Sequence, residues 1–124
     1  MIRKAYGPGH KEVVYHRLFD EETKVHGLKV EKEKKIPVYS QRTGKVVGYY
    51  QPDRLVEDKI IVEIKSSKFT TKNDEKQLYY YLRNSQYEVG YLVNFSTPKL
   101  YVKRIIYTND RKPFLRLTAS GGYK

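Results

Sequence analysis

Apolar residues spaced three to four positions apart predict two helices in this chain. The first spans about residues 10–26, where Val14 and Leu18 lie near one face and Gly27 follows as a C-terminal stop. The second spans about residues 73–85, again with apolar side chains gathered on one face. We therefore expect each helix to pack an apolar stripe against a common core.

Short apolar runs, the first of which alternates in part, predict five strands, at about residues 28–39, 46–56, 59–65, 87–95 and 99–107. The third strand is apolar on both faces, and charges appear only at its end, as Glu63 and Lys65. Such a pattern is typical of a central strand whose two faces are both covered. The order αβββαββ predicts an α/β fold with a mixed central sheet flanked by helices.

Three charged side chains stand where two apolar runs end. Asp53 is followed by a short turn and then by the strand that ends in Glu63-x-Lys65. Burying a carboxylate is costly unless it is compensated, and two close carboxylates repel each other. A divalent cation resolves both problems, because hard cations take oxygen ligands from Asp and Glu. The alternative is an ordinary cross-strand salt bridge.

The composition favours a soluble protein that binds polyanions. The formal charge is +11, and the last 26 residues hold seven basic side chains against one acid. A merely solvated surface is the alternative. Because the chain has no cysteine, disulfides and thiolate metal sites are excluded, and a cytoplasmic location is expected. No apolar run approaches the ~20 residues that cross a bilayer, so no membrane partner is expected.

Several short patterns in the same order resemble one nuclease superfamily. Gly9-His-Lys-Glu12-Val-Val-Tyr15 fits the pattern GxxExxY, and Pro52-Asp53 with Glu63-x-Lys65 fits PD-(D/E)xK. The chain therefore resembles the GxxExxY proteins of the PD-(D/E)xK superfamily over about residues 7–106. This resemblance implies a restriction-endonuclease-like core of order αβββαβ and a metal-dependent phosphodiesterase activity.

The resemblance also implies roles for the acidic residues. Asp53 and Glu63, completed by Glu12 and by the main-chain carbonyl of Ile64, are expected to hold one or two Mg²⁺ ions, for which Mn²⁺ substitutes. Lys65 is expected to orient the attacking water or to stabilise charge on the phosphate. Glu12 has an alternative role, because an acid in the first turn also complements the helix dipole.

Other candidate residues lie on the second helix and the last strand. Gln77 and Tyr81 are four positions apart, and they resemble the Gln-x-x-x-Tyr signature of the RecB-like branch, in which such groups support the site and contact DNA. The alternative for Tyr81 is core packing, the role that we also favour for Tyr15. Lys103 and Arg104 are expected to contact nucleic acid.

We expect one nuclease-like domain over residues 1–108, followed by a basic C-terminal extension over residues 109–124. The extension is expected to dock in part and to end loosely at residues 120–124. The function predicted first is a metal-dependent nuclease acting on DNA in repair, recombination or defence, with a second copy of the chain, in a homodimer, as a candidate partner. The alternatives are a nucleic-acid-binding module that keeps the fold but cuts poorly, and a non-nuclease scaffold.

Overall fold

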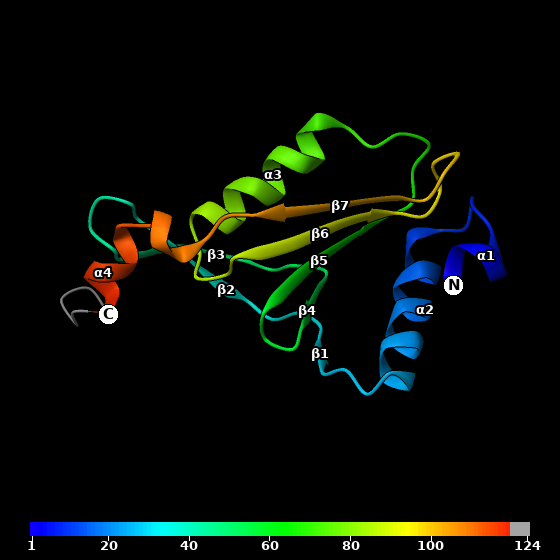
Figure 1. Ribbon diagram of the computed structural model, residues 1–124, viewed down its shortest axis with the longest axis horizontal. Helices are drawn as coiled ribbons and strands as arrows, with labels where there is room; N and C mark the ends of the chain where they lie inside the picture. The colour runs from blue at the N-terminus through cyan, green and yellow to red at the C-terminus, as the bar shows by residue number, and fades with distance from the viewer. Residues whose placement is uncertain (120–124) are drawn as a thin grey trace.

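The computed structural model describes residues 1–119 of the chain. The helices are α1 (Ile2–Tyr6), α2 (Glu12–Val25), α3 (Lys72–Arg83) and α4 (Phe114–Ala119), with a 3₁₀ turn at Asn109–Arg111 (Figure 1). The strands are β1 (Val30–Glu31), β2 (Ile36–Tyr39), β3 (Val46–Tyr50), β4 (Arg54–Val56), β5 (Ile60–Lys65), β6 (Val89–Asn94) and β7 (Tyr101–Ile106). Within residues 1–119, no helix is long and apolar enough to cross a membrane.

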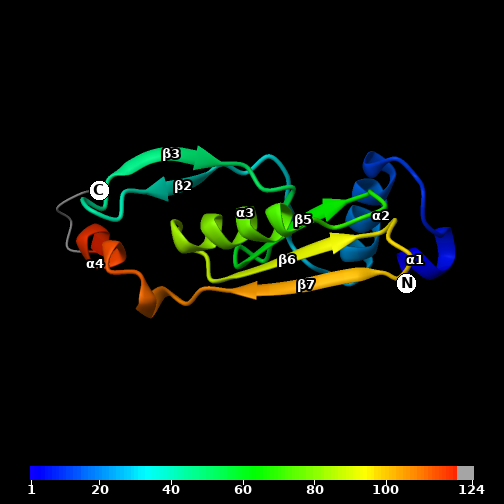
Figure 2. The same ribbon diagram turned by 90° about the horizontal axis from the view of Figure 1, so that it is seen from above.

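The central sheet is mixed and lies between helices, as the sequence predicts. Its strand order is β1-β4-β5-β6-β7, in which β5 and β6 run parallel and the other neighbours are antiparallel. Helix α3 buries Leu78 against Ile61 on one face, whereas α2 buries Tyr15 against Ile64 on the other (Figures 1 and 2). The middle strand β5 is therefore covered from both sides, which explains its apolar residues on both faces.

Tyr15 packs α2 onto the sheet, and this confirms the favoured interpretation of its role. The side chain is fully buried, and its ring stacks on Phe95 with the ring centroids 4.7 Å apart. Its hydroxyl donates to the Gly7 carbonyl at 2.6 Å and accepts from the His10 main-chain N–H at 3.3 Å. The tyrosine of the GxxExxY pattern thus fixes the chain that enters the helix carrying Glu12.

Two of the five predicted strands are each split in two, which is a correction to the sequence-based boundaries. The run at 28–39 breaks after β1, where Glu33 has a left-handed φ of 58° that a continuous strand cannot contain. The run at 46–56 breaks before Pro52, which has no N–H to donate to a ladder. As a result, β2 and β3 form a separate hairpin, apart from the central sheet (Figure 2).

The N-terminal helix α1 was not predicted, because its five residues are too few to show a period of 3.6. It lies beside α2, at the end of the molecule opposite α4 (Figure 1). Arg3 from this helix donates to the Pro98 carbonyl at 2.9 Å, which ties the N-terminal segment to the turn between β6 and β7.

The C-terminal segment packs on the body as far as the structure describes it. Phe114 is buried and stacks on Tyr39, with 5.7 Å between the ring centroids. The buried ammonium of Lys112 donates to the carbonyls of Ser85 and Tyr87, and burial lowers its pKa to about 8. Lys112 is therefore an internal anchor rather than part of a basic surface. The expected loose end at 120–124 lies outside the described residues, and the boundary at residue 108 stays a prediction.

Candidate active site

Asp53 occupies the junction between the hairpin and the central sheet. It follows the buried Pro52 and directly precedes β4, so its main chain lies beside the end of β5. Its Oδ2 accepts the main-chain N–H of Ile64 at 2.8 Å. The polar main chain at Asp53 also favours the charged form of the Glu63 carboxylate and so lowers its pKa. The backbone of the two strands therefore holds the two acids next to each other, as their spacing predicts.

Glu63 has the most perturbed environment of the site. Its pKa is raised from an ordinary 4.5 to about 7, chiefly by burial; Lys65 and the main chain at Asp53 act to lower this pKa, and the negative charge of Glu12 acts to raise it. Glu12 and Lys65 therefore both lie within electrostatic reach of Glu63. A carboxylate whose charged form is this unfavourable is typical of a functional site.

His16 is a site residue that the sequence analysis missed. It lies one turn after Glu12 on α2, with its Nε2 atom 3.7 Å from Glu12 Oε2 and 3.8 Å from Asp53 Oδ2. Within residues 1–119, this Nε2 atom is buried and has no hydrogen-bond partner. The signal was available, because residues four apart share a helical face and His16 is four residues from Glu12.

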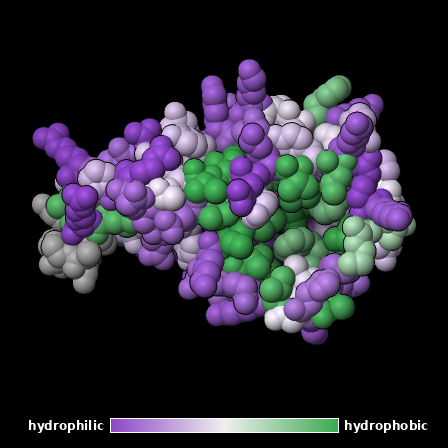
Figure 3. Space-filling view, in the orientation of Figure 1, coloured by the Kyte–Doolittle hydropathy of each residue, from purple (hydrophilic) through white to green (hydrophobic). Residues whose placement is uncertain are grey.

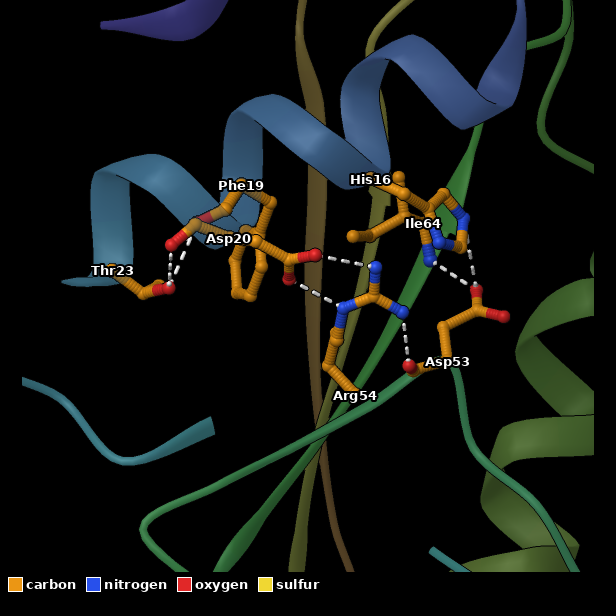
Figure 4. A network of polar contacts seen from close by, with 7 residues as sticks. All are labelled: His16, Phe19, Asp20, Thr23, Asp53, Arg54 and Ile64. Atoms are coloured by element: carbon orange, nitrogen blue, oxygen red, sulfur yellow. Dashed lines mark hydrogen bonds and ion pairs between the residues drawn. The ribbon is translucent and has the colours of Figure 1, made fainter. Parts of the chain in front are cut away.

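An ion pair between the buried Arg54 and the half-buried Asp20 fixes the strand next to Asp53. Arg54 donates to both carboxylate oxygens of Asp20 on α2, at 2.6 and 2.9 Å, and to the main-chain carbonyl of Asp53 at 2.6 Å (Figure 4). Figure 4 shows His16 reaching the Asp53 carboxylate from the same helix. Helix α2 therefore contacts Asp53 directly through His16 and indirectly through Asp20 and Arg54.

We expect Asp20→Asn to destabilise the protein by about 2 kcal/mol, because the Arg54 guanidinium is left buried without its anion. Urea unfolding of the variant and the wild type measures the difference. The matched control is Glu22→Gln, which removes an exposed i,i+4 pair with His26 (3.4 Å) and should cost less than about 0.5 kcal/mol. Equal losses for the two variants would show that the buried pair has no special role.

Gln77 and Tyr81 have different surroundings, although both lie on α3. Gln77 is exposed and lines a shallow hollow with Asn73 and Tyr80. Tyr81 is half-buried and stacks on Tyr50 of the hairpin, with ring centroids 3.5 Å apart. This contact fits the packing alternative for Tyr81, and the roles of both residues toward substrate stay predictions.

Lys103 and Arg104 are exposed on the edge strand β7 and point to opposite faces, because neighbours in a strand alternate. Lys103 pairs with Leu92, which in turn pairs with Glu63, so Lys103 shares the Glu63 face about 10 Å away. Arg104 lies on the other face between exposed Val102 and Ile106. Apolar side chains gather in the middle of the view in Figure 3, with polar ones around them. Lys103 is therefore closer than Arg104 to the Glu63 face, and contact of either residue with nucleic acid stays a prediction.

The donor types fit a divalent cation, whereas their arrangement is not that of a closed metal site. Among residues 1–119, no three Asp, Glu or His side chains form a group that could hold an ion as they stand. Yet two strand-borne acids lie next to each other, and a third approaches from α2. The buried His16 Nε2 also has no hydrogen-bond partner in the part of the chain that the structure describes. A cation would also offset the burial that disfavours the charged form of Glu63. In the structure, Asp53 Oδ2 accepts a hydrogen bond from the Ile64 N–H. The role of the Ile64 carbonyl as a metal ligand stays a prediction.

Comparison with known protein families identifies the family of this chain. The family model described as the PD-(D/E)XK nuclease superfamily matches residues 1–105. This chain belongs to the PD-(D/E)XK nuclease superfamily. No curated protein matches this nuclease-superfamily domain.

Two solved structures share the fold of this PD-(D/E)XK domain. The structure titled "Crystal structure of SSO0001" superposes with a TM-score of 0.55 at 22% identity, covering 86% of this chain and 55% of the other. An alkaline exonuclease, LHK-Exo, from Laribacter hongkongensis superposes with a TM-score of 0.51 at 18% identity, covering 84% of this chain and 64% of the other. The domain thus spans less than two thirds of either solved chain.

Proposed function

We propose that this domain is a metal-dependent nuclease that hydrolyses phosphodiester bonds in DNA. The observation that carries the proposal is the junction of β4 and β5, where Asp53 and Glu63 are held side by side with Lys65 two residues further along. Membership of a nuclease superfamily and similarity to a protein described as an exonuclease support it. The finer assignments, to the GxxExxY proteins and to the RecB-like branch, rest on the short motifs alone.

The proposed roles follow from position and charge. Asp53 and Glu63 hold Mg²⁺ or Mn²⁺, with Glu12 and the Ile64 carbonyl completing the shell. When bound, the ion lowers the pKa of a ligated water and neutralises charge on the phosphate. Lys65 stabilises negative charge that develops on the phosphate or orients the attacking water. Gln77, exposed on α3, contacts the bound substrate and thereby helps to hold it at the site.

The net charge supports nucleic acid as the substrate. A chain of charge +11 attracts phosphates, and Lys103 places a cation on the face that carries Glu63. Four parts of the proposal rest on the sequence. They are DNA as the preferred nucleic acid, a role in repair, recombination or defence, a homodimer, and a cytoplasmic location.

The test is cleavage of labelled single-stranded, duplex and branched DNA, with RNA of the same sequence in parallel, in Mg²⁺ or Mn²⁺. We expect cleavage that EDTA abolishes and that Glu63→Gln removes. Glu21→Gln is the matched control, because it neutralises an exposed acid on α2 and should leave the rate unchanged. Cleavage that persists in the Glu63 variant would contradict the assigned site.

The second candidate is a nucleic-acid-binding module that cuts poorly. It is favoured by the absence, within the described residues, of a ready three-ligand metal group. Both candidates predict that log K falls with log[salt], with a slope near −0.9 per phosphate neutralised on duplex DNA. Salt-dependent binding without cleavage in either metal would support the module, and binding that does not change with salt would contradict both candidates.

A further inference from the structure

The loop of residues 66–71 (the 66–71 loop) follows the proposed site directly and carries an exposed aromatic side chain. It connects Lys65 at the end of β5 to α3, and its Phe69 is 77% exposed. Single exposed apolar residues are common on protein surfaces and need no explanation by themselves. Two features distinguish Phe69 from such a residue: the hydrogen bonds that anchor its loop, and the cations beside it.

The loop is fixed at both ends by one buried side chain. Asn94, the last residue of β6, is fully buried and pairs with Lys65 across the sheet. Its Oδ1 accepts the Ser67 main-chain N–H at 3.2 Å, and its Nδ2 donates to Ser67 Oγ and Thr70 Oγ1 at 3.0 and 3.1 Å. Ser67 Oγ also donates to the Phe69 carbonyl at 2.9 Å. Phe69 is therefore presented to solvent from an ordered turn that is attached to the strand next to Lys65.

The surroundings of Phe69 suit a nucleic-acid strand. The neighbouring Lys68 and Lys72 are exposed, so the aromatic ring stands between two cations along the chain. Phe69 lies four positions after Lys65, which limits their Cα atoms to about 14 Å apart, a distance of a few nucleotides. On the other side of the loop, Lys68 lines a shallow hollow with Gly9 and polar groups of the segment before α2.

We propose that Phe69 stacks on an unpaired base of the strand whose phosphate lies at the Asp53–Glu63–Lys65 site. The inference rests on the proposed function and narrows its substrate class to single-stranded or frayed ends. A ring flanked by cations is the combination by which proteins bind single strands, because every unpaired base offers a face for stacking. In an intact duplex these faces are covered by neighbouring bases, so a duplex offers Phe69 no equivalent contact.

The test is binding of the full chain, without divalent metal, to a fluorescent single-stranded oligonucleotide and to a blunt duplex of the same length. Phe69→Ala should raise the Kd for the single strand about tenfold and change the Kd for the duplex less than twofold. Phe69→Trp should retain the affinity for the single strand. Tyr49→Ala, which removes an aromatic side chain that is 66% exposed on the β2–β3 hairpin, is the matched control and should change neither. A 2-aminopurine base should be quenched at one position by the wild type and not by Phe69→Ala.

Three results would overturn the inference: equal weakening of both ligands, an unchanged single-strand Kd, or a change in self-association of the protein alone. The binding measurement is independent of cleavage, so the two proposals fail separately. Cleavage without a Phe69-dependent single-strand preference contradicts only the stacking role. Phe69-dependent binding without cleavage in any metal supports the stacking role and contradicts the nuclease.

Discussion

Lys65→Met is expected to lower the rate of DNA cleavage by about 100- to 1000-fold, the range typical for removal of one preorganised group that stabilises developing charge. The side chain lies on the Glu63 face at the end of β5, and its positive charge acts on the Glu63 carboxylate. Methionine keeps much of the apolar stem and removes only the charged end. Single-turnover cleavage at saturating Mn²⁺ measures the effect.

The affinity for Mn²⁺ separates a role in catalysis from a role in metal binding. If Lys65 acts on the phosphate or the water, Mn²⁺ titration by electron paramagnetic resonance should give dissociation constants for wild type and Lys65→Met that agree within a few fold. Lys59→Met is the matched control, since Lys59 is exposed just before the other end of β5 and should affect neither quantity. Equal losses of rate and metal affinity would refute the assigned role.

Glu63→Gln is expected to stabilise the metal-free protein at pH 8 while it abolishes cleavage. The pKa of Glu63 is raised from 4.5 to about 7 in the folded protein, chiefly by burial. The folded state therefore binds the proton more tightly than the unfolded state, and this favourable contribution is complete below pH 4.5. It is lost as the pH rises from 4.5 through 7, by about 3 kcal/mol in total.

Urea unfolding in EDTA at pH 4.5 and pH 8 measures this effect. The stability of Glu63→Gln relative to the wild type should increase by about 3 kcal/mol between the two pH values. Glu21→Gln, at an exposed position on α2, should show no comparable change. Mg²⁺ should stabilise the wild type and not Glu63→Gln, because a ligand stabilises only the state that binds it. A stability difference between Glu63→Gln and the wild type that does not change with pH would contradict the raised pKa of Glu63.

The neighbourhood of Asp53, Glu63 and Lys65 could be predicted because its geometry is local. Residues two apart on a strand share a face, and a turn of few residues brings Asp53 beside the strand that carries Glu63. The central strand was likewise visible in its two apolar faces. The splitting of the outer strands was harder to predict, because apolar residues stand on both sides of Pro52 and the breaks depend on single backbone positions.

Two contacts of helix α2, from Asp20 to Arg54 and from His16 to Asp53, could not be predicted, since they depend on how the helix crosses the sheet. Asp20 and Arg54 are 34 positions apart, and no pattern in the sequence links them. His16 has helical spacing from Glu12, but its distance to Asp53 follows only from the packing of Tyr15 under the helix. Gln77 illustrates the converse, because its spacing from Tyr81 is correct while its side chain faces solvent.

Anomalous scattering from crystals soaked in Mn²⁺ tests the central claim most directly. We predict one manganese peak in contact with carboxylate oxygens of both Asp53 and Glu63, at a site where Glu12 or His16 can approach from α2. The same soak of Glu63→Gln should give no peak there. A wild-type crystal with manganese bound only elsewhere, or with none at the junction of β4 and β5, would contradict the assignment of this site to metal-dependent cleavage.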